Sequence, residues 1–215
     1  MIDLRVTLKA LVFVPAILCA TAPTAQEAAP DAPGIAPALP ELPSDPAPAA
    51  PEVLSEDPQI LLDRLGTLTE EDGGEAIRLA AEIMERWTHS GSAAMDLLLV
   101  RGKDAIEAED YVRAIAHLTA LTDHAPQFAE AWNQRATAFF LMERYGEALS
   151  DIEQVLILEP RHFNALAGLG IILDQLGEEK AALRAFRAAQ DAHPAEPNVN
   201  AAVERLEQQT GGRTL

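Results

Sequence analysis

Proline recurs at a fixed interval in the second half of this chain. Pro126, Pro160 and Pro194 stand 34 residues apart, and beyond Asp57 the sequence holds only two other prolines. A fixed period of this length indicates one supersecondary unit repeated along the chain. A proline also ends a helix, because it lacks an N–H and disfavours helical geometry in the residue before it. The spacing therefore predicts tandem helical units, each ending close to its proline.

In this register the full repeats span 95–128, 129–162 and 163–196, each read as helix, turn and helix. Residues at equivalent positions of the three repeats, which we call a column, are similar in size. Two columns hold only small residues: Gly102, Ala136 and Gly170 in one, and Ala114, Ala148 and Ala182 in the other. Large residues fill two others: Leu98, Trp132, Leu166, Leu118, Ile152 and Phe186. Two antiparallel helices approach closely only where side chains are small, and large neighbours fill the space between them. We expect the small columns to mark the helix crossings, with Ala148 buried.

The repeats are flanked by less regular helical sequence, which gives a predicted domain over 58–210. Residues 59–94 are interpreted as a degenerate unit, with one helix over 58–71 and a second-helix pattern over 74–87. At the other end a capping helix is predicted over 198–209. Val199, Val203 and Leu206 lie on one face of it, with polar residues between them.

The middle repeat resembles the tetratricopeptide repeat most closely, through Trp132, Ala136, Phe139, Tyr145, Gly146, Ala148 and Pro160. The resemblance covers the three full repeats and implies an all-α, right-handed solenoid of antiparallel helix pairs that binds proteins. Two departures stand out. Glu179 replaces the tyrosine found at Tyr111 and Tyr145, and Arg101 and Arg135 occupy a column that the family usually fills with leucine.

The two arginines allow two interpretations. A guanidinium facing a helix pair must find partners or cost several kcal/mol. One hypothesis is a ladder of buried ion pairs with acids such as Asp151 or Glu82. The alternative is that the arginine stems pack while their heads reach solvent or backbone carbonyls.

The resemblance also implies a concave surface lined by the first helix of each repeat. The partner-binding candidates on it are Leu99, Lys103, Ile106, Glu130, Asn133, Thr137, Phe140, Ala167 and Ile171. Its apolar members would form a floor for a peptide or helix. The family's carboxylate-binding variant has lysine and asparagine where this chain has Leu99 and Lys103, so chaperone C-terminal tails are not expected as ligands. The alternative is that the chain's own termini cover this surface.

The N-terminus is typical of an export signal, predicted over 1–25. Arg5 and Lys9 precede an apolar run from 10 to 20, which is too short to span a bilayer comfortably. Cleavage is expected after Ala22 or Ala25, giving an exported, periplasmic protein without membrane insertion. A lipid on Cys19 is the alternative, although the residue before it is not small.

Residues 26–57 are predicted to be a disordered linker. The stretch from Pro23 to Pro58 holds ten of the fifteen prolines, and residues 26–57 contain seven acids and no lysine, arginine or aromatic residue. Such a segment cannot bury enough apolar surface to fold. We interpret it as an extended tether; a proline-rich recognition ligand is the alternative.

Composition argues against several classes of function. The net charge of −18 comes without a cluster of cations, which disfavours nucleic acid and anionic membranes as partners. No phosphate loop, paired-histidine helix motif or nucleophile elbow is present, and the only cysteine lies in the signal, so we expect no cofactor and no enzyme activity. His124, His162 and His193 are interpreted as helix-end residues, with metal ligation as the alternative.

We therefore predict a non-enzymatic adaptor or scaffold that binds a protein or peptide partner through its concave face, with a role in cell-envelope assembly by analogy with periplasmic repeat proteins. Self-assembly into homo-oligomers is the alternative. A catalytic site among the acids of the degenerate unit is the third hypothesis, and a run of acids is usually a solvated turn.

Overall fold

The computed structural model describes residues 57–211. The signal peptide predicted over 1–25 and all but the last residue of the linker predicted over 26–57 lie outside the described residues. Residues 57–211 form helices and turns and no strand. The elements are α1 (Pro58–Leu65), η1 (Glu70–Asp72), α2 (Gly73–Trp87), α3 (Ala93–Glu107), α4 (Tyr111–His124), α5 (Ala129–Leu141), α6 (Tyr145–Leu158), α7 (Phe163–Gln175), α8 (Glu179–Ala192) and α9 (Pro197–Gly211).

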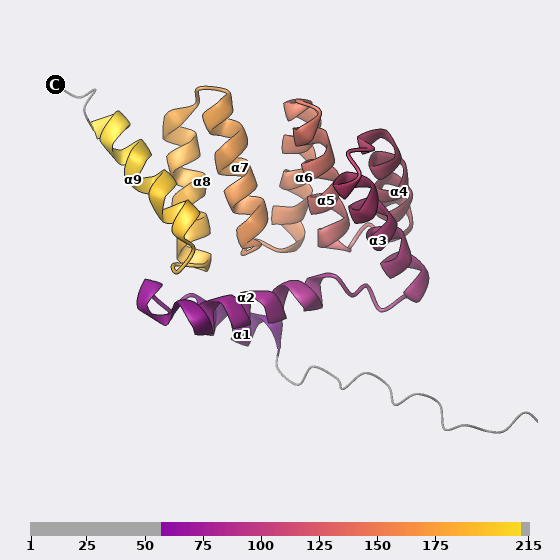
Figure 1. Ribbon diagram of the computed structural model, residues 1–215, viewed down its shortest axis with the longest axis horizontal. Coiled ribbons are helices and arrows are strands. Elements are labelled where there is room, and N and C mark those ends of the chain that lie inside the picture. The colour runs from indigo at the N-terminus through magenta and orange to yellow at the C-terminus, as the bar shows by residue number, and fades with distance from the viewer. Residues whose placement is uncertain (1–56, 212–215) are drawn as a thin grey trace, which may run out of the picture. The chain divides into compact units, whose positions relative to one another are not determined.

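The three repeats are the helix hairpins α3–α4, α5–α6 and α7–α8, which stand side by side in Figure 1. The second helix of each hairpin ends two residues before the repeating proline, as expected for a helix terminator. The turn inside each hairpin has one residue with positive φ, at the equivalent positions Glu109, Glu143 and Gly177. Only the last of these is glycine, the residue that adopts this conformation without steric cost.

The small columns lie at the helix crossings, as predicted. A Cβ added to Gly102 would stand 2.6 Å from the Leu118 side chain, and one added to Gly170 would stand 2.8 Å from the Phe186 ring. Ala148 is 0% exposed. Residue size at these positions therefore sets how closely the two helices of a repeat approach, which confirms the helical-hairpin architecture.

The first two helices do not stack on α3. The helix predicted over 58–71 ends at Leu65, and a short 3-10 turn precedes α2. Their apolar residues, among them Leu62 and Ile83, share one hydrophobic cluster with Phe186 of α8 and Val203 of α9. Figure 1 shows α2 running crosswise to α7 and α8. We call this pair of helices, residues 58–87, the N-terminal hairpin.

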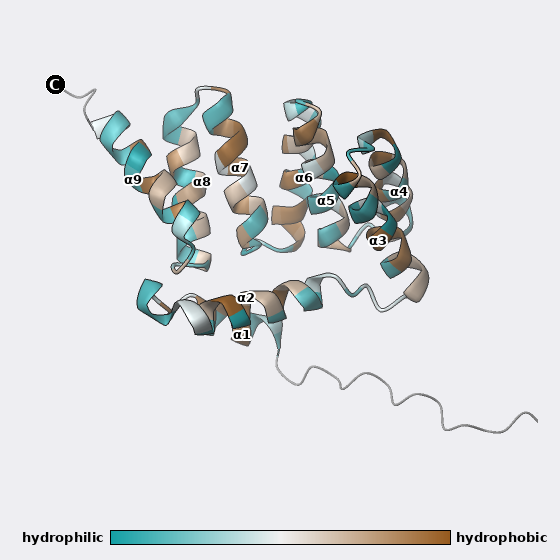
Figure 2. Cartoon of the chain, in the orientation of Figure 1, coloured by the Kyte–Doolittle hydropathy of each residue, from teal (hydrophilic) through white to brown (hydrophobic). Residues whose placement is uncertain are grey.

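Hydropathy follows the packing of the helices. Figure 2 shows apolar residues recurring along α6 and α7 between hydrophilic positions. The last helix, α9, buries Val199, Val203 and Leu206 in the same cluster as the N-terminal hairpin. Within residues 57–211, no helix is both long and apolar enough to cross a bilayer.

Candidate partner-binding site

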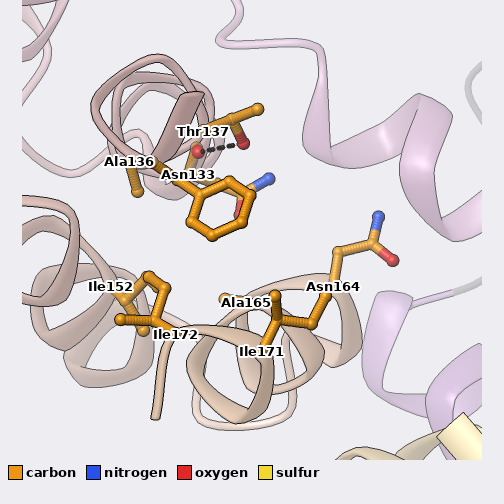
Figure 3. A pocket seen from close by; sticks show the side chains of 10 residues that line it. Asn133, Ala136, Thr137, Ile152, Asn164, Ala165, Ile171 and Ile172 are labelled. Atoms are coloured by element: carbon orange, nitrogen blue, oxygen red, sulfur yellow. Dashed lines mark hydrogen bonds between the residues drawn. The ribbon is translucent and has the colours of Figure 1, made fainter. Parts of the chain in front are cut away.

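A small cavity opens between the middle repeat and the third. Its volume is about 190 Å³, and Figure 3 shows side chains of α5, α6 and α7 converging on it. We call it the central pocket. It is lined by Asn133, Ala136, Thr137, Phe140, Ile152, Asn164, Ala165, Gly168, Ile171 and Ile172.

The wall of the central pocket is apolar, with three polar side chains and no charged one. Asn133 donates its amide N–H to the carboxylate of Glu130 at 3.1 Å. The Thr137 hydroxyl donates to the backbone carbonyl of Asn133 at 3.0 Å. Asn164 reaches Met84 of the N-terminal hairpin, with 3.2 Å from its Nδ2 to the sulfur. These contacts fix the polar groups, so the pocket offers a pre-formed apolar hollow.

Four of the predicted binding residues line the central pocket, and five lie elsewhere. Asn133, Thr137, Phe140 and Ile171 are brought together by α5 and α7. The others are Leu99, Lys103, Ile106, Glu130 and Ala167. Leu99 and Glu130 are buried in the protein interior, and Lys103, Ile106 and Ala167 lie outside the pocket lining.

Leu99 is 2% exposed and packs inside the cluster around Leu118, so it is a core residue. Lys103 and Ile106 are partly buried on α3, outside the pocket lining. Ala167 lines a separate hollow between α7, α8 and α9. The candidate surface is therefore shorter than the full run of first helices.

Glu130 is 1% exposed and belongs to a buried polar cluster. Its carboxylate accepts hydrogen bonds from Asn133, from Gln134 at 2.6 Å and from Nε2 of His162 at 3.2 Å. His162 is the N-cap of α7, where its Nδ1 accepts from the backbone N–H of Ala165 at 3.2 Å. Because Nδ1 accepts, the proton is on Nε2, which donates to Glu130. Glu130 thus holds α7 against α5.

The residues missed by the sequence reasoning are those from α6 and from the sides of α5 and α7. They are Ala136, Ile152, Ala165, Gly168 and Ile172, and Asn164 of α7 is a further lining residue outside the nine candidates. Gly168 carried a usable signal. It occupies the position of Val100 and Gln134 in the other repeats, and its lack of a side chain leaves the space beside Ile152 open, since an added Cβ would stand 3.8 Å from Ile152. A small residue at a position that holds large residues in the other repeats can therefore mark a pocket.

The two unusual arginines differ in their surroundings. Arg135 makes a bidentate ion pair with Asp151, with Nε and Nη2 each 2.7 Å from a carboxylate oxygen. Its Nη1 also donates to the hydroxyl of Thr122 at 2.9 Å. Arg101 is exposed, and Glu82 pairs with Arg86 instead. Of the hypothesised buried ion pairs, one is present in the described part of the chain, between Arg135 and Asp151.

His124, His162 and His193 lie at helix ends and do not converge. Among residues 57–211, no group of three or more histidine, cysteine, aspartate or glutamate side chains is arranged to hold a metal ion. His193 is buried at the end of α8, edge-on to Phe163 with 5.3 Å between ring centroids. This burial lowers the pKa of its imidazole, and the nearby Glu196 carboxylate opposes the shift.

Comparison with known proteins places the chain in a family. The sequence model of the tetratricopeptide repeat matches residues 99–151 and 134–197. A tetratricopeptide repeat-containing protein of Rhizobium etli is 38% identical over 163 residues, covering 74% of this chain and 80% of the relative.

Solved structures share the fold. The tetratricopeptide repeat domain of Sgt2 from Aspergillus fumigatus has a TM-score of 0.54 at 20% identity, covering 57% of this chain and 83% of that domain. The first such domain of Spaghetti (RPAP3), solved with an HSP90 peptide, has a TM-score of 0.53 at 19% identity, covering 54% and 93%. With its hairpins, small columns and matched repeats, the chain belongs to the tetratricopeptide repeat family.

Proposed function

We propose that this chain is a non-enzymatic interaction module that takes one apolar side chain of a protein or peptide partner into the central pocket. The observation that carries the proposal is the pocket itself, an apolar hollow between two repeats with exposed Thr137 and Ile171 on its lining. The first domain of Spaghetti (RPAP3), which shares this fold and was solved with an HSP90 peptide, supports a peptide-like ligand.

The size of the central pocket favours a side chain over a small molecule. Its volume of about 190 Å³ is below the roughly 300–1,000 Å³ of most small-molecule sites. No charged side chain lines it, and the Thr137 hydroxyl donates to a backbone carbonyl, so the pocket has no general acid or base to activate a nucleophile. An apolar anchor seated in a well-packed pocket is the arrangement in which few residues supply most of the binding energy.

We further propose that the protein is exported to the periplasm and acts there as an adaptor, in cell-envelope assembly by analogy with other periplasmic repeat proteins. The basis is the apolar run of residues 10–20 after Arg5 and Lys9. Cell fractionation and N-terminal sequencing of the purified protein test this. A mature chain beginning at residue 23 or 26 is expected, and an intact N-terminus in the cytoplasmic fraction contradicts it.

Photo-crosslinking in intact cells tests the pocket. A photoreactive amino acid at Thr137 is expected to attach to a partner protein, identified by mass spectrometry. Gly168→Leu fills the pocket with an apolar side chain that a helix accepts, because the nearest atom to an added Cβ is 3.8 Å away at Ile152. This change should abolish the Thr137 adduct.

The matched control places the photoreactive group at Ile157, which is 64% exposed on α6 and outside the central pocket. Adducts from this position should not respond to Gly168→Leu. A Thr137 adduct that survives the filled pocket, in a protein whose circular dichroism is unchanged, contradicts the proposal. So does the absence of any protein adduct at Thr137.

A further inference from the structure

The first repeat presents a packing surface that the later repeats bury. In α5 and α7 the third and tenth residues of the repeat pack on the second helix of the preceding repeat. Ala131 and Ala138 are each 0% exposed against α4. The equivalent residues of α3 are Leu97, which is 48% exposed, and Asp104, which is also exposed. The surface is open because the N-terminal hairpin packs against α8 and α9 instead.

Two apolar and two charged residues make up this open surface, which we call the α3 end face and define as Leu97, Val100, Arg101 and Asp104. Val100 is 49% exposed, one helical turn from Leu97. Arg101 lines a shallow hollow beside Arg113 and His117 of α4. The face therefore combines apolar surface with an uncovered guanidinium.

Arg101 occupies the same repeat position as Arg135, whose surroundings show what such an arginine requires when it is covered. Arg135 takes a bidentate carboxylate from Asp151 and a hydroxyl from Thr122 of the preceding repeat. In the first repeat the position of Asp151 is His117, and Asp104 of α3 lines the same hollow as Arg101 without forming an ion pair with it. A helix packed over Arg101 is favoured when it brings a carboxylate that pairs with the guanidinium directly, because a covered guanidinium without a paired counter-charge is strongly unfavourable.

The far end of the same chain does not supply this helix. The exposed positions of α9 include Glu204 and Glu207, and alanine is the largest apolar side chain among its exposed non-terminal residues. Such a surface could approach Arg101 but could not cover Leu97 and Val100 with apolar side chains. A stacked second copy is therefore disfavoured as the occupant.

We propose that the α3 end face binds an amphipathic helix of a partner protein, whose apolar residues cover Leu97 and Val100 and whose carboxylate pairs with Arg101. The helix takes the place that the second helix of a preceding repeat would hold. This surface is separate from the central pocket, so the protein has two independent docking sites.

A synthetic peptide of residues 73–89 serves as the probe. In the repeat register its Glu85 falls at the position of Thr119. Thr119 is uncharged, and its hydroxyl oxygen lies 3.3 Å from Nη1 of Arg135 in the middle repeat. The matched control peptide carries Glu85→Gln. We expect the full-length protein to bind the Glu85 peptide at least about tenfold more tightly than the control, by fluorescence anisotropy.

Two protein variants localise the binding. Arg101→Gln should remove the preference for Glu85, and Leu97→Glu should abolish binding of both peptides while the circular dichroism spectrum stays unchanged. Ile171→Glu, which alters the central pocket, should leave peptide binding intact, so failure here is distinguishable from failure of the pocket proposal.

Three results would overturn the proposal: no binding at several hundred micromolar peptide, equal affinity for the two peptides, or binding that persists in Leu97→Glu. A concentration-dependent dimer of the full chain that Leu97→Glu dissolves, seen by sedimentation, would also overturn it. That outcome would assign the face to a second copy of the chain.

Discussion

Trp87 and His162 stack with ring centroids 4.1 Å apart and an angle of 12° between their planes. The tryptophan ends α2, and the histidine caps α7 while donating to Glu130 of α5. One buried imidazole therefore joins the N-terminal hairpin to two repeats. The indole Nε1 is buried without a hydrogen-bond partner in the described part of the chain, so stacking and apolar contact hold this ring.

Replacing Trp87 with alanine should release the N-terminal hairpin before the repeats unfold. Truncation of a buried aromatic residue costs about 3–5 kcal/mol, and the cavity lies where the hairpin meets α7. Trp87→Phe keeps a stacked ring and loses the unpaired N–H, so it should cost less. Hydrogen exchange measured by mass spectrometry should show faster exchange in 58–87 than in 129–192 for the alanine variant. Equal acceleration in both regions would contradict this order.

Arg135 and Asp151 should behave as a coupled pair. Arg135→Met leaves the Asp151 side chain, which is 5% exposed, without its counter-charge. The expected loss is about 3–5 kcal/mol in the free energy of unfolding, measured by urea denaturation. The double variant Arg135→Met with Asp151→Leu should recover most of this loss, because no buried charge remains.

Arg101→Met is the matched control for this pair. Its guanidinium is exposed in the free protein, so the change should move stability by less than about 0.5 kcal/mol. A double-mutant cycle without coupling between Arg135 and Asp151 would show that the ion pair does not stabilise the middle repeat.

The repeats could be predicted from the sequence because size columns report helix crossings directly. Gly102 and Gly170 each face one large side chain, and no tertiary information beyond the period was required. The place of the N-terminal hairpin could not be predicted in this way. Periodicity shows that Leu62 and Ile83 must be buried, and it does not show which surface buries them.

The candidate site was predictable in part for the same reason. The family register put Asn133, Phe140 and Ile171 on one surface, and these residues line the central pocket. It could not anticipate that Glu130 is covered, because its partner His162 comes from the loop before the next repeat. This contact between α5 and the start of α7 involves a residue of the connecting loop, and the repeat period does not encode its partner.

Gly170 tests the role of the small columns in stability. An alanine Cβ at this position would stand 2.8 Å from the Phe186 ring, so the helices must move apart. Overpacking of this kind costs about 1–3 kcal/mol, which should exceed the gain of about 1 kcal/mol in helix propensity. Gly146→Ala is the matched control, since an added Cβ meets nothing within 4 Å and should stabilise α6. Thermal denaturation should therefore shift the two variants in opposite directions, and a shared direction would contradict the crossing argument.

His193 should make stability depend on pH in the mildly acidic range. Burial lowers the pKa of the native imidazole below its ordinary value of about 6.5, with Glu196 opposing the shift. Between the two pKa values the unfolded chain binds more protons than the native one, so the stability that His193 contributes is present above pH 6.5 and falls as pH decreases through the native pKa. Urea denaturation from pH 7.5 to 5 should show a falling free energy of unfolding, with a shallower slope in His193→Gln. Carboxylates titrate mostly below this window, and the comparison with His193→Gln separates this imidazole from the other four histidines. An identical slope in the two proteins would show that His193 stays accessible to protons in the folded state.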